Sequence, residues 1–105
     1  NTNSATLVLY INGTGEASAT YNCAGITGRT TSITAETKLE RKWGILWLDV
    51  DGAEWVETIS SDYLIKTHRF QLTKTGTYRA TTKFTVSGTG GSNDSIKCTS
   101  QYVYE

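Results

Sequence analysis

Gly76–Val86, with the sequence GTYRATTKFTV, is the stretch that decides the fold. From Thr77 to Ser87, apolar or small residues alternate with polar ones, which is the pattern of a β-strand that buries one face. The residues expected on the inward face are Tyr78, Ala80, Thr82, Phe84 and Val86. The sequence therefore predicts a strand here, with its inward face in a hydrophobic core.

The same alternation continues on both sides of this strand. Short segments rich in Gly, Asn and Ser separate the alternating runs and read as turns and loops. The further strands expected are Leu7–Ile11, Glu16–Ala24, Thr31–Arg41, Ala53–Ile59, Leu64–Thr73 and Ser95–Tyr104. Ala35–Arg41 also contains residues that suit a helix, but its β-branched lead-in, its strict alternation and the following Gly44 favour a strand.

The segment Lys42–Ser61 holds all three tryptophans, in the run WGILWLDVDGAEWVETIS. We interpret it as a continuation of the preceding strand, a turn at Asp51 and Gly52, and the return strand Ala53–Ile59. Asp-Gly between apolar residues is a strong β-hairpin signal. The sequence thus predicts a hairpin that carries tryptophans.

Seven strands with regular turn signals and no helix predict an all-β fold. The natural arrangement is a two-sheet antiparallel sandwich, formed as a single domain over residues 1–105. A chain of this length buries one thin core and has no room for a deep substrate cavity as well.

Gly76–Val86 resembles the sixth strand of immunoglobulin-like and fibronectin-III-like domains. In those domains a Gly-x-Tyr at the strand start carries the tyrosine corner, whose hydroxyl bonds back to the preceding turn. The resemblance makes Tyr78 that tyrosine, and it implies a seven-strand immunoglobulin-like sandwich. Ala80 stands where antibody-type domains have a cysteine, so their disulfide pattern is not reproduced.

Cys23 and Cys98 lack the neighbouring Cys or His residues that a zinc site requires. The choice is between two buried free thiols and one disulfide, and a surface rich in Thr, Ser, Gly and Asn suits an extracellular protein, which favours the disulfide. In the sandwich that the resemblance implies, the loops Gly25–Thr30 and Gly88–Asp94 lie at one end. A Cys23–Cys98 bridge would join the two sheets there.

The order of segments also resembles small secreted proteins of Gram-positive bacteria that have no assigned function. The shared features are a second strand of small residues, a charged strand, a tryptophan-containing hairpin and the Gly-x-Tyr strand. This resemblance implies a secreted or surface-bound module and no particular activity. The polar start Asn1–Thr6 and the lack of an initiating Met lead us to expect a processed N-terminus.

Charge and hydropathy argue against two kinds of partner. The chain has 10 Lys plus Arg and 10 Asp plus Glu, which gives a formal net charge of zero. Because the two signs are interspersed, no basic surface for a nucleic acid or an anionic membrane is expected. The apolar runs are much shorter than the roughly 18 residues of a transmembrane helix. We therefore expect no nucleic-acid partner and no membrane insertion.

No motif specifies catalysis, and none specifies a cofactor. His68 is the single histidine, and a partly buried strand residue is its simplest role. Asp49 with Asp51, or Glu54 with Glu57, offers paired carboxylates, but solvated strand charges explain them better. Asp49, Asp51 and Glu54 resemble part of a calcium loop without its remaining ligands, so a weak calcium site stays open. We expect a protein that is not an enzyme.

Trp43, Trp47 and Trp55 are the candidate ligand-binding residues. An exposed indole offers a flat apolar face that can stack on a sugar ring or anchor a protein partner. The alternative is core packing, because immunoglobulin-like sandwiches pack a third-strand tryptophan between the sheets, a role open to Trp43 or Trp47. We expect at least one indole in the core, and exposure of another stays open.

These features predict a secreted or cell-surface, non-enzymatic binding module for a protein or a glycan. The expected contact surfaces are the loops Gly25–Thr30 and Gly88–Asp94 or the tryptophan-bearing hairpin, because rigid folds carry specificity on loops. Two alternatives remain. One is a structural unit that assembles through edge strands at Leu7–Ile11 and Ala53–Ile59, and the other is a secreted antibacterial toxin.

Overall fold

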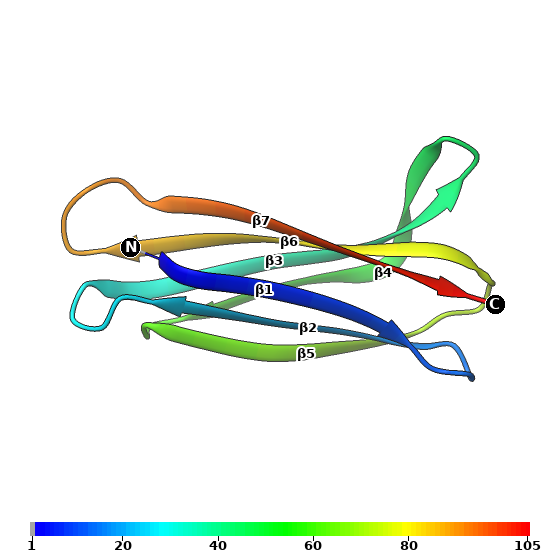
Figure 1. Cartoon of the computed structure of the whole chain (residues 1–105), viewed down its shortest axis with the longest axis horizontal. Helices are drawn as coiled ribbons and strands as arrows, with labels where there is room; N and C mark the ends of the chain where they lie inside the picture. Colours follow the sequence, from blue (N-terminus) through cyan, green and yellow to red (C-terminus); the bar gives the residue numbers. More distant parts are fainter. Residues whose placement is uncertain (1) are drawn as a thin grey trace.

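Antiparallel β-strands make up most of the chain in the computed structural model, which describes residues 2–105. The strands are β1 (Thr2–Ile11), β2 (Glu16–Gly25), β3 (Thr30–Trp43), β4 (Leu46–Ile59), β5 (Tyr63–Gln71), β6 (Gly76–Gly88) and β7 (Asp94–Tyr104) (Figure 1). Residues 2–105 contain no helix, so none of them forms an apolar helix able to cross a lipid bilayer. Ala35–Arg41, the one segment with helical composition, lies within β3.

The strands form two layers, as predicted. One sheet has three strands in the order β1-β2-β5, and the other has four in the order β4-β3-β6-β7. Every hydrogen-bonded pair is antiparallel. The predicted all-β, two-sheet architecture is therefore confirmed. Leu7–Ile11 and Ala53–Ile59 belong to β1 and β4, which are edge strands.

The core follows the alternation seen in the sequence. On β6 the predicted inward residues Tyr78, Ala80, Thr82, Phe84 and Val86 are all buried. Thr82 is tolerated there because its hydroxyl shares a 2.8 Å hydrogen bond with that of the buried Thr37, which satisfies both polar groups. Small residues on β2, including Ala17 and Ala19, let the sheets pack closely.

The tryptophan-bearing hairpin turns at a different place from the one predicted. Trp43 pairs with Leu46, so the turn lies at Gly44 and Ile45, where Gly44 has φ +63°. Asp51 and Gly52 instead lie inside β4. The prediction of a turn at Asp51 and Gly52 is therefore wrong.

Asp51 and Gly52 form part of a wide bulge in β4. The register runs from Lys38 opposite Glu54 directly to Glu40 opposite Asp49, so β4 carries extra residues that have no ladder partner. Gly52 has φ +80°, a conformation that glycine adopts without strain. Because a bulge bends its strand, the far half of the hairpin rises out of the sandwich (Figure 1).

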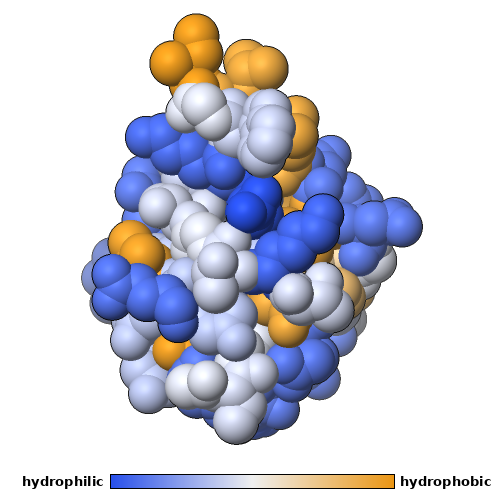
Figure 2. Space-filling view, turned by 90° about the vertical axis from the view of Figure 1, so that its right-hand side faces the viewer, coloured by the Kyte–Doolittle hydropathy of each residue, from blue (hydrophilic) through white to orange (hydrophobic). Residues whose placement is uncertain are grey.

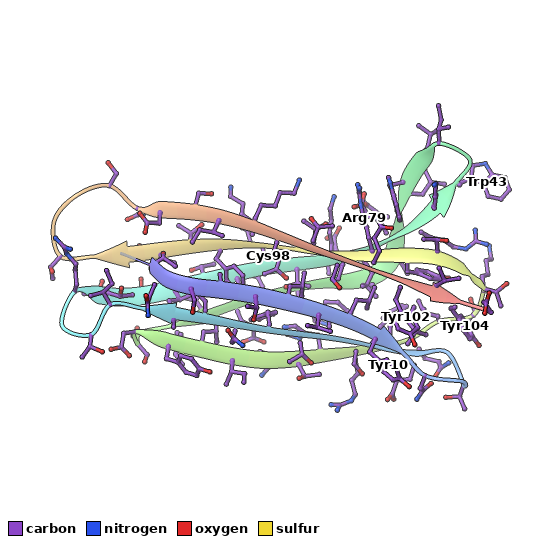
Figure 3. All side chains as sticks on the ribbon, in the orientation of Figure 1. Tyr10, Trp43, Arg79, Cys98, Tyr102 and Tyr104 are labelled. Carbon is purple, nitrogen blue, oxygen red and sulfur yellow. The ribbon has the colours of Figure 1, made fainter. Side chains whose placement is uncertain are left out.

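The two cysteines are free thiols, so the predicted Cys23–Cys98 disulfide is wrong. Cys23 lies on β2 between Ala5 of β1 and Leu64 of β5. Cys98, labelled in Figure 3, donates its Sγ hydrogen to the Ala5 carbonyl at 3.8 Å. Cys98 of β7 therefore lies against β1. A disulfide would require it to lie against Cys23 on β2, the neighbouring strand.

Candidate functional site

The far half of the β3–β4 hairpin gathers four exposed large apolar side chains, among them Ile45, the most exposed one of the described chain. We call residues 42–48, with the sequence KWGILWL, the hairpin tip. The exposed fractions are 94% for Ile45, 64% for Trp43, 58% for Leu46 and 50% for Leu48. In Figure 2 apolar residues cap the top of the molecule, where the hairpin projects. Exposed apolar side chains are usually scattered singly over a protein surface, so this cluster is a candidate contact site.

Trp47 and Arg79 support the hairpin tip on one face. The Arg79 guanidinium carbon lies 4.4 Å from the centre of the Trp47 ring, a cation–π contact. Its Nε donates to Glu40 Oε1 at 2.8 Å, and Lys38 pairs with both Glu40 and Asp49. Figure 3 shows Arg79 beneath the raised hairpin.

A groove of about 380 Å³ separates the hairpin from the turn between β5 and β6. We call it the hairpin groove. Its lining includes Arg41, Trp43, Leu48, Asp51, Gln71 and Lys74. Trp43 thus contributes to the groove as well as to the tip, and the remaining side chains combine apolar surface with both hydrogen-bond donors and acceptors.

Hydrogen bonds fix the turn between β5 and β6, which forms the wall of the hairpin groove opposite the hairpin. Tyr78 is buried, and its hydroxyl donates to the Lys74 carbonyl at 2.6 Å. Arg41 donates from Nε and Nη2 to the Thr75 carbonyl at 3.1 and 2.7 Å. Gly76 has φ +144°, a conformation that residues with a side chain rarely adopt, and a Cβ there would also lie only 3.0 Å from Arg41 Nε. The groove wall formed by the turn between β5 and β6 is therefore fixed, and Arg41 ties that wall to β3, the strand that carries Trp43.

The three predicted tryptophans do not form one platform. Trp43 lies at the exposed tip, while Trp47 points to the opposite face of the hairpin, over Arg79. Trp55 is half-buried and packs against the core, where it stacks on His68. None of the three indoles is fully buried in the core. Trp55 comes nearest to the expected role because it packs against the core, and neither Trp43 nor Trp47 packs between the sheets.

His68 is a buried strand residue, as the sequence indicated. Its Nε2 lies 3.1 Å from the hydroxyl of Tyr21. Burial lowers the pKa of His68, and Lys66 lowers it further, while the nearby Glu57 opposes them. Burial, helped by Glu57, raises the pKa of Tyr21 to about 12. These groups pack as a neutral pair inside the sandwich.

The predicted carboxylates lie at the bulge and on the outer surface. Asp49 pairs with Lys38 at 3.4 Å, and Glu57 pairs with Lys66 at 3.8 Å. Asp51 and Glu54 are exposed. Across residues 2–105, no three His, Cys, Asp or Glu side chains gather closely enough to hold a metal ion.

A second groove of about 490 Å³ shares no lining residue with the hairpin groove, and its lining is mostly charged. It includes Glu40 and Arg79, which already pair with each other, and it lacks a tryptophan as exposed as Trp43. Its charges are thus partly committed to the fold, which makes the hairpin groove the better candidate site.

The end loops Gly25–Thr30 and Gly88–Asp94 lie together at the opposite end of the sandwich (Figure 1). Thr89 N donates to the Arg29 carbonyl at 2.9 Å and joins them. Their side chains include one exposed large apolar residue, Ile26. The loops therefore offer less contact surface than the hairpin.

The sequence interpretation did not single out Ile45, Leu46, Gln71 or Arg79. With the turn expected at Asp51 and Gly52, Ile45 and Leu46 read as part of the strand that leads into it. The only local signal for the true turn was Gly44, which precedes a run that pairs back onto Arg41–Trp43. Gln71 and Arg79 reach the hairpin through tertiary contacts and carry no local signal.

Comparison of the chain with protein-family models, with curated protein sequences and with solved structures finds no match in any of the three.

Proposed function

We propose that this chain is a secreted or cell-surface, non-enzymatic module that binds a glycan in the hairpin groove. The single observation that carries the proposal is Trp43, which is 64% exposed beside a preformed groove with polar side chains. Exposed apolar surface that is continuous with a groove is typical of ligand-binding sites.

The chemistry of the groove fits a sugar ring better than a purely apolar ligand. A pyranose has a face of C–H groups and an edge of hydroxyls. The indole of Trp43 covers the first, and Asp51, Gln71 and Lys74 supply acceptors and donors for the second.

We further propose that the sandwich is immunoglobulin-like, of the fibronectin-III type. The strand order β1-β2-β5 and β4-β3-β6-β7 supports this. The hydrogen bond from Tyr78 to the Lys74 carbonyl also supports it, because tyrosine corners bond to the backbone a few residues upstream. Such folds place their ligands on hairpins and loops, as the proposed groove does.

A glycan library printed on a surface tests the proposal, with the fluorescently labelled chain as the probe. We expect at least one class of oligosaccharide to bind, with a dissociation constant that calorimetry confirms in solution. Trp43→Ala and Asp51→Ala should each weaken that binding at least tenfold. Tyr63→Ala, an exposed aromatic outside the groove, should leave it unchanged.

Two results would contradict the proposal. One is the absence of saturable glycan binding at any concentration tested. The other is binding that Trp43→Ala and Asp51→Ala both leave intact. Capture of a peptide ligand that competes for the same groove would favour a protein partner instead.

A further inference from the structure

Ligand binding in the hairpin groove does not explain the exposed apolar side chains at the apex of the hairpin. Ile45 is 94% exposed and projects beyond the groove lining, at the turn that ends β3. We propose that the hairpin tip inserts into the interfacial layer of a lipid bilayer and anchors the sandwich to a membrane surface. This goes beyond glycan binding, because Ile45 and Leu46 do not line the hairpin groove.

The shape of the tip favours a bilayer over a protein pocket. Trp43 and Leu46 form a cross-strand pair on one face, Trp47 lies on the other, and Ile45 lies at the turn between them. The end of the hairpin therefore carries apolar side chains on both faces and at the turn. A protein partner covers one face of a hairpin, whereas a fluid layer surrounds its end.

The length of the apolar tip matches an interfacial depth. Leu48 lies three residues along the strand from Ile45, which is about 10 Å at roughly 3.3 Å per residue. Interfacial segments bury their apolar side to about 5–10 Å. Arg41 is paired with Leu48 at this level, and the next pair brings the exposed carboxylate of Asp49. These charges limit the depth of insertion.

The residue types along the tip follow the layers of a bilayer surface. The aliphatic Ile45 and Leu46 occupy the apex, and Trp43 and Trp47 flank them. Tryptophan prefers the headgroup level of membranes. Lys42 is the single charged residue of the tip, and a lysine stem is long enough to place its ammonium among lipid headgroups.

The backbone also suits shallow insertion. The β3–β4 ladder is continuous from the Glu40–Asp49 pair to the Trp43–Leu46 pair. Within the tip, the unpaired peptide groups are those of the turn residues Gly44 and Ile45 and the outward-facing groups of the edge strand β4. Unpaired peptide groups are costly in hydrocarbon, but at the headgroup level water satisfies them. The tip therefore enters the interfacial layer without spanning the bilayer.

The expectation of no membrane contact rested on net charge and on the absence of a long apolar segment. The tip needs neither property, because its attraction is apolar and local. The Trp47–Arg79 contact and the hydrogen bonds from Arg41 to Thr75 fix the raised position of the hairpin on the sandwich. The tip is therefore exposed in the free protein, without any rearrangement on membrane binding.

Flotation of the full chain with lipid vesicles tests the proposal. The vesicles are pure phosphatidylcholine, and phosphatidylcholine with about one third phosphatidylserine. We expect the protein to float with both, to lose little binding in 0.5 M NaCl, and to shift its tryptophan emission to shorter wavelength. Ile45→Asp should weaken the partition coefficient at least tenfold.

Val8→Asp is the matched control, because Val8 is 61% exposed on β1, away from the tip. It should bind vesicles like the unchanged chain. Equal loss in Val8→Asp and Ile45→Asp, or no flotation with either vesicle, would overturn the proposal. Binding confined to phosphatidylserine and abolished by salt would also overturn it, since it would indicate attraction by charge.

The two proposals can fail separately. The vesicles carry no sugar, so failure of glycan binding leaves flotation unaffected. Asp51→Ala should abolish glycan binding and keep flotation, whereas Ile45→Asp should do the reverse. Light scattering of Ile45→Asp and the unchanged chain checks for self-association, and a tip that mediates dimers in place of lipid binding would contradict the membrane proposal.

Discussion

The indole of Trp55 lies face to face on the imidazole of His68, with ring centres 4.9 Å apart and planes within 8° of parallel. The two residues come from β4 and β5, the edge strands that face each other on one side of the sandwich. Phe70 packs edge-on against the same indole, with 6.4 Å between the two ring centres. These three rings close the side of the sandwich that has no strand to cover it.

The folded protein should lose stability as the pH falls through the range of histidine titration. Burial lowers the pKa of His68 below its ordinary value of 6.5, so the unfolded chain takes up this proton first. The contribution of His68 is therefore fully present above pH 6.5 and is lost as the pH falls toward the lowered value. Urea unfolding at pH 7.5, 6.0 and 5.0 measures this loss.

His68→Phe is the control for that titration, because it keeps a flat ring against Trp55 and removes the ionisable group. Its free energy of unfolding should change less between pH 7.5 and 5.0 than that of the unchanged chain. An equal pH dependence in both proteins would show that other groups cause the effect.

The exposed and half-buried tryptophans should separate binding from stability. Trp55→Ala removes the stack on His68 and opens the side of the core, so we expect a loss of about 2–3 kcal/mol in the free energy of unfolding. Trp43→Ala removes an exposed side chain and should change that free energy by less than about 0.5 kcal/mol. Equal losses in urea unfolding would contradict the placement of the two indoles.

The Tyr78 hydroxyl should contribute measurably to stability. In Tyr78→Phe the Lys74 carbonyl loses its 2.6 Å partner, so the free energy of unfolding should fall by about 1–2 kcal/mol. Tyr63→Phe, at an exposed position, should leave it unchanged within about 0.5 kcal/mol. Thermal unfolding of both variants compares them, and no difference between them would mean that the hydrogen bond adds nothing.

Arg79 should link the hairpin to the four-stranded sheet. Its removal in Arg79→Met leaves the Glu40 side chain, which is 9% exposed, without its 2.8 Å partner, and we expect a loss of about 1–3 kcal/mol. In Arg79→Met combined with Glu40→Gln, part of that loss should return, because no buried charge remains unpaired. Purely additive losses in urea unfolding would exclude coupling between the two side chains.

The thiols should be protected in the folded protein and unbridged. Burial raises the pKa of both Cys23 and Cys98, so at neutral pH the reactive thiolate is scarce. Alkylation by iodoacetamide should be slow in buffer and complete in urea, and the intact mass should be the same with and without reductant. A mass increase of about 2 Da on reduction would instead show that Cys23 and Cys98 form a disulfide.

Much of the fold follows from local pattern. The alternation of Thr77–Ser87 predicted the buried face of β6 residue by residue, since side chains of a strand point to opposite faces in turn. The hairpin turn was misplaced for an equally local reason. The Asp-Gly pair predicts a glycine with positive φ, and Gly52 has one at +80°, but that conformation serves a bulge as well as a turn.

The candidate site was harder to predict than the fold. Three tryptophans were identified from the sequence, but their separate roles depend on the register between β3 and β4. A shift of one residue moves a side chain to the opposite face. The register therefore decides that Trp43 is exposed, that Trp47 contacts Arg79, and that Trp55 lies against the core.

The sequence by itself determined the strand content and the inward face of β6, because these depend on neighbours along the chain, and its composition determined the zero net charge. Only the tertiary structure decided which strands of one sheet pack against which strands of the other. The contact of β7 with β1 leaves Cys23 and Cys98 unbridged, and the bulge at Asp51 and Gly52 raises the hairpin tip. Both depend on contacts between residues distant in the chain, and such contacts leave no periodic signal in it.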